Sequence, residues 1–219
     1  MRKTLDTPKL TNGRPLPLNS EQGAKRERIL NAALKLFAHE PYQAVTMDRV
    51  AKAANVAKGT LYLYFPSKDA LYLGILSDGL DSAYRTYQAS ADPRLPLVER
   101  LRRAITVTVE FFDHRRDFLQ FYATEEPRLA EARNRIMEEA RERGSNFFAS
   151  LIQDGIRFGV FAAVDPRVAT LAIQGSIRSL LLYYGNSRPV AEISRELGDL
   201  MLKSLAINPA HFFKQMHQQ

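Results

Sequence analysis

The chain has 219 residues, of which 45% are hydrophobic and 25% are charged, and its formal net charge is +7. This length is sufficient for one or two domains with a buried core. Because the sequence contains no cysteine, it excludes disulfides, thiolate metal sites and cysteine nucleophiles. We find neither an apolar run long enough to span a membrane nor a secretory signal, and we expect a cytoplasmic protein without a membrane partner.

The positive charge is concentrated in the first third of the chain. Residues 1–72 hold 12 Lys and Arg against 6 Asp and Glu, and the remaining residues hold 19 against 18. A basic region binds polyanions because each neutralised phosphate releases condensed counterions. A solvated basic surface without a partner is the alternative, so the charge favours nucleic-acid binding only together with a suitable motif.

Residues 1–20 are predicted to form a flexible basic arm. Three prolines prevent regular structure there, and one acidic residue opposes four basic ones, Arg2, Lys3, Lys9 and Arg14. Basic arms of this kind track phosphates or insert an arginine into a minor groove. A tail without a function is an equal alternative.

The first helix is predicted to begin at Ser20 and to end at Glu40, before a proline. Its apolar residues recur with helical spacing, at Ile29, Ala33, Leu36 and Phe37. A second helix is predicted to begin after Thr46, whose hydroxyl can cap its N-terminus. Apolar residues share one face of this helix, at Met47, Val50, Ala51 and Ala54. Asn55 tolerates left-handed backbone and is expected to turn the chain.

A third helix, over about residues 57–64, is predicted to pack across the second one. Leu61 and Phe65 are expected to face the core. The outer surface is cationic, hydroxyl-rich and aromatic, and its residues are Lys58, Thr60, Tyr62 and Tyr64. Gly59 is unfavourable in the first turn of a helix, which indicates that a partner approaches the backbone there. Such a pair of helices matches the helix-turn-helix plan for the DNA major groove, although a plain helical corner has the same spacing.

The residues of this third helix and of the segment after it carry a family resemblance. The run AKGTLYLYFPSKDAL at residues 57–71 closely resembles the signature of the TetR family of bacterial transcriptional regulators, and the pattern at residues 46–56 resembles it too. The resemblance covers residues 24–73. Within this run Pro66 ends the third helix, and Ser67 can cap the helix that follows.

The resemblance implies a sequence-specific DNA-binding regulator, most simply a ligand-responsive repressor that binds a pseudo-palindromic operator as a homodimer. It implies contacts with double-stranded DNA from Thr46, Lys58, Gly59, Thr60, Tyr62, Tyr64 and Lys68. The helix over residues 67–88 adjoins these residues at one end and an aromatic region at the other. We therefore expect this helix to couple effector binding to DNA affinity.

After residue 71, prolines separate runs that are each long enough for a helix, with a break expected near residues 113–114. The chain is thus predicted to be all-α, with about nine helices. We place a helix-turn-helix DNA-binding domain at residues 21–66, an effector-binding and dimerisation domain at residues 67–207, and a tail at residues 208–219.

Two helices predicted near the end of the chain, over residues 166–184 and 189–205, carry small residues with contact spacing. This pattern favours pairing with a second copy, although an intrachain hairpin is the alternative. The resemblance implies that dimers form through the last two major helices. The predicted dimerisation residues are Ala172, Gly175, Ser176, Ser179, Ile193, Leu197, Leu200 and Ser204.

Nine aromatic residues are concentrated within residues 84–148. Aromatic residues of helices usually form a solid core, but the resemblance implies a small-molecule pocket here, and the composition favours a hydrophobic or aromatic effector. The predicted effector-binding residues are Tyr84, Tyr87, Thr108, Phe111, Phe112, Phe118, Phe121, Tyr122, Phe147, Phe148 and Gln174.

An enzymatic function is not indicated. The four histidines are scattered, and the sequence has no HExxH, no GxSxG and no glycine-rich phosphate loop, so we expect no metal, no cofactor and no catalysis. Two alternatives to a repressor stay open. One is a helical small-molecule-binding or scaffold dimer without specific DNA readout, and the other is an activator or a broadly binding architectural protein.

Overall fold

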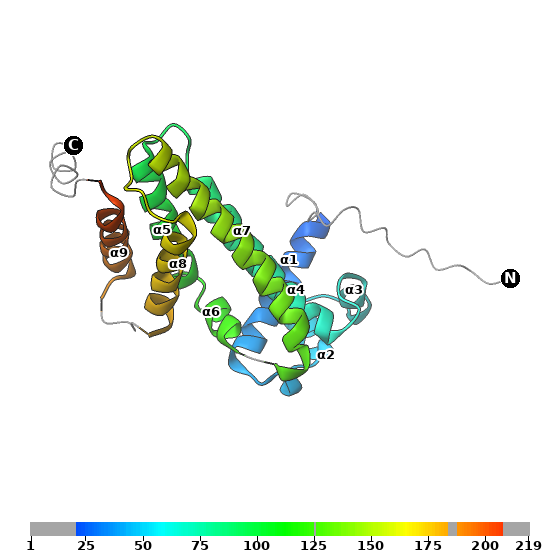
Figure 1. Ribbon diagram of the computed structural model, residues 1–219. Helices are drawn as coiled ribbons and strands as arrows, with labels where there is room; N and C mark the ends of the chain where they lie inside the picture. The colour runs from blue at the N-terminus through cyan, green and yellow to red at the C-terminus, as the bar shows by residue number, and fades with distance from the viewer. Residues whose placement is uncertain (1–20, 125, 184–187, 208–219) are drawn as a thin grey trace.

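The computed structural model describes residues 21–124, 126–183 and 188–207, and within them it is all-α (Figure 1). Its α-helices are α1 (Glu21–His39), α2 (Met47–Ala53), α3 (Lys58–Tyr64), α4 (Lys68–Ser90), α5 (Leu97–Asp113), α6 (Arg116–Ala123), α7 (Ala130–Arg157), α8 (Pro166–Tyr183) and α9 (Val190–Leu205). Two short 3-10 helices, η1 (Tyr42–Ala44) and η2 (Pro127–Leu129), precede α2 and α7. The nine α-helices of the described residues confirm the predicted fold class. The predicted arm at residues 1–20 and tail at residues 208–219 lie outside the described residues.

Side-chain caps and one left-handed residue set the boundaries of the helices around α3. The Thr46 hydroxyl accepts a hydrogen bond from the backbone N–H of Arg49 at 3.3 Å, and the Ser67 hydroxyl accepts one from Ala70 at 3.1 Å. Asn55, between α2 and α3, has φ 51°, which lies in the left-handed region that asparagine tolerates. The predicted caps and the predicted turn are therefore confirmed.

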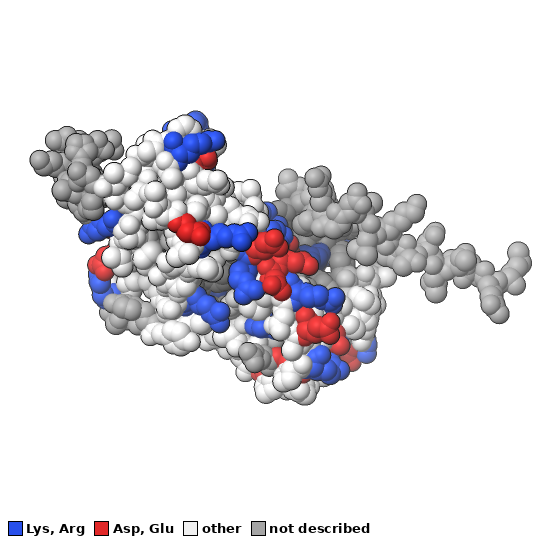
Figure 2. Space-filling model, viewed as in Figure 1, with Lys and Arg blue, Asp and Glu red and all other residues white. Residues whose placement is uncertain are grey.

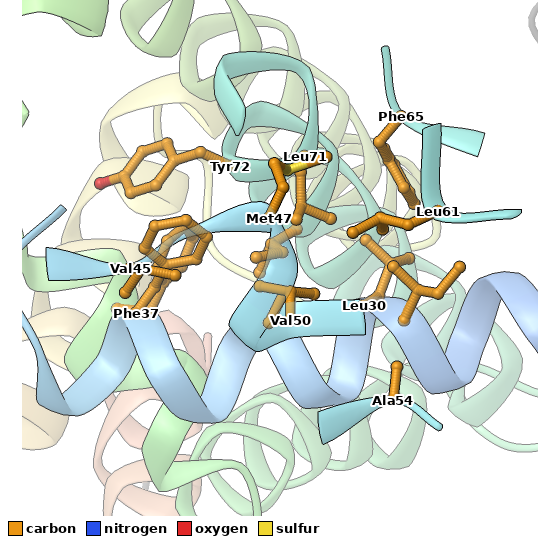
Figure 3. Close-up of a cluster of buried hydrophobic side chains, with 14 of the residues drawn as sticks. Leu30, Phe37, Val45, Met47, Val50, Ala54, Leu61, Phe65, Leu71 and Tyr72 are labelled. Atoms are coloured by element: carbon orange, nitrogen blue, oxygen red, sulfur yellow. The ribbon is translucent and has the colours of Figure 1, made fainter. Parts of the chain in front are cut away.

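A first hydrophobic core lies between α1, α2 and α3 and continues into α4 and α6. Figure 3 shows Leu61 and Phe65, from α3 and the residue after it, pointing toward Leu30 of α1. The ring of Phe37 meets the ring of Tyr72 of α4 edge to face, with centroids 5.3 Å apart. This core thus extends across residue 66, where the sequence placed the end of the helix-turn-helix domain.

A second core joins α5, α7, α8 and α9. Phe161, in the segment between α7 and α8, is buried in it and forms an isolated antiparallel bridge with Ala206, after α9. Its ring lies 1.9 Å from the point that a Cβ atom would occupy at Gly155 of α7. Because this glycine has no side chain, the ring can pack directly on the α7 backbone.

The helices α4 and α7 extend between the two cores. α4 packs against α1, α5 and α7, and the ring of Phe118 of α6 lies 2.0 Å from the point that a Cβ atom would occupy at Gly79 of α4. Figure 1 places α2 and α3 at one end of the molecule and α8 and α9 at the other. α4 consequently connects the N-terminal helix α1 with α5 and α7, and the short helix α6 also contacts both α1 and α5.

Candidate nucleic-acid interface

The two helices α2 and α3 form a compact helix-turn-helix. A hydrogen bond from the backbone N–H of Val56 to the carbonyl of Ala51, 3.0 Å long, closes the turn after α2. The apolar face of α2 is buried, as the sequence predicts. Leu61 of α3 is fully buried, so the position of α3 on this unit is fixed by packing and the opposite face of α3 is left to solvent.

The exposed face of α3 carries most of the predicted DNA-contacting residues. Lys58, Gly59 and Tyr62 are exposed, and Thr60 and Tyr64 are half-buried at its edges. Apart from the neighbouring backbone of α3 itself, no atom of the described residues lies within 4 Å of the point that a Cβ atom would occupy at Gly59, so the backbone of α3 is open to a partner there. This face has the donors, aromatic rings and close backbone approach that a nucleic-acid groove requires.

Lys58 is held by an ion pair across the helix-turn-helix. Its ammonium lies 2.7 Å from a carboxylate oxygen of Asp48 in the first turn of α2, and both side chains are largely exposed. The hydrogen bond with Asp48, and then the charge of this carboxylate, raise the pKa of Lys58 above its usual value. The lysine therefore has an internal partner that a phosphate must displace.

Thr46 is exposed at the N-terminus of α2. Its hydroxyl oxygen accepts the capping hydrogen bond from Arg49, which leaves the hydroxyl proton available for a second acceptor. The resemblance assigns a phosphate contact to this residue, and the exposed hydroxyl has the geometry for one. The contact itself stays a prediction.

Lys68, also predicted to contact DNA, is directed into the protein. Its ammonium donates to the backbone carbonyls of Tyr42 and Val45 at 2.9 Å each, and it lies 4.2 Å from the centroid of the Tyr42 ring. These contacts fasten α4 to the segment between α1 and α2. The phosphate contact of Lys68 stays a prediction, and in the structure its ammonium holds this segment in place.

Polar contacts of α1 and η1, which lie next to the helix-turn-helix in the sequence, attach this end of the molecule to α4, η2 and α6. Arg26 of α1 pairs with Asp78 of α4 at 2.6 Å. The hydroxyl of Tyr42 donates to Asp69 of α4, and Arg128 of η2 lies 2.6 Å from the same carboxylate. Burial, followed by the hydrogen bond to Asp69, raises the pKa of Tyr42 to about 12. A further contact, between α1 and α6, joins the His39 imidazole and the Asp117 carboxylate at 3.3 Å.

The residues predicted to bind an effector divide into two groups. One group surrounds α6, where the rings of Phe112, Phe118, Phe121 and Tyr122 contact one another and Phe118 and Phe121 are buried in the first core. Phe111 lies edge to face with Phe112. Thr108 is also buried, and its hydroxyl donates to the carbonyl of Ala104 one turn earlier in α5.

The second group lies between α4, α7 and α8. The ring of Tyr87 contacts those of Tyr84, Phe147 and Phe148, with centroids 5.1 to 5.7 Å apart. Burial raises the pKa of Tyr87 above its usual range, which keeps its hydroxyl neutral. Gln174 of α8 accepts a hydrogen bond from the Ser145 hydroxyl at 3.0 Å, beside this group. A pocket in either group stays a prediction.

The predicted dimerisation residues lie on α8 and α9 at the end of the molecule away from α3. Ala172, Gly175, Ser179, Leu200 and Ser204 are exposed, Ser176 is half-buried, and Ile193 and Leu197 are buried within the chain. An open groove of about 430 Å³ between the two helices is lined by several of these residues. Figure 2 shows few charged side chains over α8.

The sequence did not identify three large apolar side chains that extend this face. Val168 and Leu171 of α8 are each 63% exposed, and Tyr183, the last residue of α8, is 82% exposed. They stand at spacings of three and twelve residues, which place all of them on one side of the helix with Gly175 and Ser179. Their helical spacing, on the side of α8 that carries Gly175 and Ser179, was the signal in the sequence that could have found them.

The sequence also did not single out Leu63 of α3, which is 82% exposed, and it gave no structural role to Arg26 or Arg128. Tyr42 was expected to close the small core of this domain and is buried there, but its hydrogen bond to Asp69 was not predicted. Among the described residues, no group of three His, Cys, Asp or Glu side chains could hold a metal ion. In the same part of the chain, no helix has the length and apolarity needed to cross a membrane.

Comparison with known proteins places family patterns on both halves of the chain. Residues 29–75 match the pattern described as "Bacterial regulatory proteins, tetR family". Residues 94–205, slightly more than half of the chain, match the one described as "Tetracyclin repressor-like, C-terminal domain". The first match contains the helix-turn-helix, and the second contains α5 to α9.

Individual relatives share about a quarter of their residues with the chain. The uncharacterized HTH-type transcriptional regulator YhgD of Bacillus subtilis is 27% identical over 165 residues, which are 75% of this chain and 86% of YhgD. The HTH-type transcriptional repressor KstR2 of Mycolicibacterium smegmatis is 27% identical over 143 residues, 65% of this chain and 70% of KstR2. The solved structure of the transcriptional regulator FadR from Bacillus subtilis in complex with stearoyl-CoA has the same fold, with a TM-score of 0.68 at 19% identity, and covers 82% of this chain and 98% of FadR.

Proposed function

The chain belongs to the TetR family of bacterial regulatory proteins and is a DNA-binding transcriptional regulator, and we propose that it is a repressor that an effector releases from its operator. The observation that carries this proposal is the helix-turn-helix with the polar, open face of α3. Leu61 anchors α3 in the core, while Lys58, Gly59 and Tyr62 face outward. The related KstR2 is named a repressor, which supports the same direction of regulation.

We infer that the DNA contacts come from α3 and from the N-terminus of α2. Gly59 and Thr60 meet base edges, while Thr46, Tyr62 and Tyr64 bind phosphates and fix the register on the duplex. Lys58 leaves its ion pair with Asp48 and binds DNA instead. Lys68 holds the segment before α2 in position. A bacterial operator lies in the cytoplasm, where we propose that the protein acts, without catalytic activity.

We propose that two copies pair through the exposed face of α8 and α9. The support is an exposed apolar stripe, with Val168, Leu171 and Leu200 among its members, next to small residues that permit close helix approach. A two-fold dimer requires an operator with inverted half-sites, roughly 34 to 36 Å apart or a multiple of that distance.

The effector that we propose is a small hydrophobic or aromatic molecule bound near the second aromatic group. Tyr84, Tyr87 and Phe147 offer ring faces, and Gln174 offers a polar atom beside them. FadR, which shares the fold, was solved with stearoyl-CoA, so long acyl chains belong in the panel of candidates together with aromatic acids.

Coupling between the effector region and α3 is proposed to run along α4. This helix carries Tyr84 and Tyr87 near its C-terminal end. Asp69 in its first turn contacts Tyr42 of η1, and Asp78 near its middle pairs with Arg26 of α1, the helix that packs against α2. An effector that binds better when α4 is displaced would lower DNA affinity by linkage, typically by about 1 to 3 kcal/mol. Operator affinity that does not change with any effector that binds would contradict this mechanism.

The experiment that tests the function is a selection from a random duplex library, followed by titrations of the selected DNA and of scrambled DNA at two salt concentrations. We expect an inverted repeat to be enriched and to bind far more tightly than scrambled DNA. Equal, steeply salt-dependent binding to both would instead favour an architectural protein, and no binding would favour a scaffold dimer. A reporter placed behind the operator then distinguishes repression from activation.

A further inference from the structure

The centre of the exposed face of α3 is occupied by Leu63. Successive residues of an α-helix are rotated by about 100°, so Leu63 lies about 160° around the helix from the buried Leu61 and about 40° from Gly59. Leu63 is 82% exposed, while Leu61 is fully buried. Gly59 and Leu63, one turn apart, therefore form the ridge of α3 that projects farthest from the protein.

The surroundings of Leu63 differ from those of the other exposed apolar residues. Its neighbours on the face are the hydroxyl-bearing Thr60 and Tyr62, and the ion pair of Lys58 and Asp48 lies at the start of the same helix. This is one apolar side chain among polar ones, and it is not part of an apolar stripe of the kind found on α8. A partner that fits it is polar and anionic overall and presents a small apolar group at one place.

The major groove of DNA has these properties. Its only apolar feature is the C5-methyl group of thymine, which projects into the groove beside hydrogen-bonding base edges. The absence of a side chain at Gly59 lets the α3 backbone approach the groove, and Leu63 then extends beyond the backbone one turn later. We propose that Leu63 is a specificity-determining residue that packs against a thymine methyl group in each operator half-site, an inference that rests on the proposed DNA-binding function.

Deoxyuridine provides the test, because it removes this methyl group and leaves base pairing unchanged. Each thymine of the selected operator is replaced in turn by deoxyuridine, in both half-sites, and the affinity of the full-length protein is measured. At one position per half-site we expect a loss of roughly fourfold for each half-site, the value for one methyl group withdrawn from water. The Leu63→Ala variant should bind the thymine and deoxyuridine operators equally at that position.

A matched control shows whether the effect belongs to Leu63. Lys52→Ala removes an exposed cation from α2, and it should weaken binding to all DNA while keeping the full deoxyuridine effect. Because Leu63 is exposed, Leu63→Ala is expected to keep the wild-type melting temperature. A deoxyuridine effect that is the same in Leu63→Ala, or that is absent from the wild type at every position, would overturn the inference while the DNA-binding function stands. Failure of the library to yield any specific site would overturn both.

Discussion

The outer face of α3 and the outer face of α8 both expose large apolar side chains, but the residues that surround these side chains differ. On α3 the single Leu63 stands among hydroxyls and a lysine ion pair. On α8, Val168 and Leu171 continue a stripe with small neighbours and few charges. The first pattern suits a charged polymer with isolated methyl groups, and the second suits a copy of itself. The neighbours of an exposed apolar residue therefore tell more about its partner than its own hydrophobicity does.

A charge placed within the apolar stripe of α8 is expected to have the largest effect on the protein. In Leu171→Glu, a carboxylate at a dimer interface would be desolvated without a partner, so we expect monomers. Because two half-sites would no longer be bound together, operator affinity should fall by roughly 100-fold or more. Light scattering and operator titration measure the two effects. Phe158→Glu, which changes an exposed residue at the end of α7, is the matched control, and a monomeric control would point to general instability.

A second contrast separates glycines inside and outside the protein. Gly79→Ala places a Cβ atom on the ring of Phe118, and we expect it to lower the free energy of unfolding by about 1 to 3 kcal/mol. Gly59→Ala meets no atom, so it should preserve or raise stability but weaken operator binding, because the new methyl group keeps the α3 backbone from the groove. Thermal unfolding and operator titration compare the two variants. Equal operator affinity of Gly59→Ala and wild type would argue against a close approach of α3.

Removing the lysine of α3 tests whether the polar residues on the exposed face of this helix contact DNA. Lys58→Ala should lower operator affinity by roughly tenfold, because a DNA contact is lost and Asp48 is left unpaired beside the phosphates. The melting temperature should stay close to that of the wild type, since an exposed ion pair contributes little to folding. Tyr64→Phe, which removes one hydroxyl, should weaken binding less. Unchanged affinity in both variants would favour the scaffold dimer.

The smallest expected effect comes from removing the internal partner of Lys58. Asp48→Asn should strengthen operator binding by at most a few-fold, because the lysine no longer exchanges one anion for another. The dependence of affinity on salt should become steeper by about one released counterion of the DNA, since the charge of Lys58 would then neutralise a phosphate without being offset by Asp48. If titrations at several salt concentrations give the same slope as for the wild type, Lys58 does not reach the DNA.

The sequence was sufficient to predict helix boundaries where they are set by the side chains of the boundary residues themselves. Thr46, Asn55 and Ser67 cap and turn the backbone through their own side chains, so the boundaries of α2, α3 and α4 could be predicted. The buried face of α2 follows from helical spacing alone. These features do not depend on what the helices pack against.

The same reasoning was insufficient where tertiary packing decides which face is covered. Ile193, Leu197 and Leu200 of α9 follow one periodicity, yet the first two are buried within the chain and only Leu200 is open to a partner. In α3 the spacing of apolar residues could not identify Leu63 as a candidate DNA contact, because a leucine in a helix is usually taken to be a core residue. Whether the aromatic residues enclose a ligand depends on gaps between side chains, which spacing does not encode.

The first core extends past residue 66 into α4 and α6, so the DNA-binding domain cannot be exchanged between relatives by itself without changing the packing of this core. A chimaera joined directly after α3 would replace the residues of this core that come from α1, α2 and α3. It would keep those from α4 and α6, among them Leu71, Tyr72 and Phe121, whose shapes fit the original N-terminal helices. The recipient would have to accept α4 and α6 as part of the graft, or the graft would need matching side chains at those positions. Altered operator preference should therefore be easier to obtain by changing the outer face of α3 alone than by transplanting the whole DNA-binding domain.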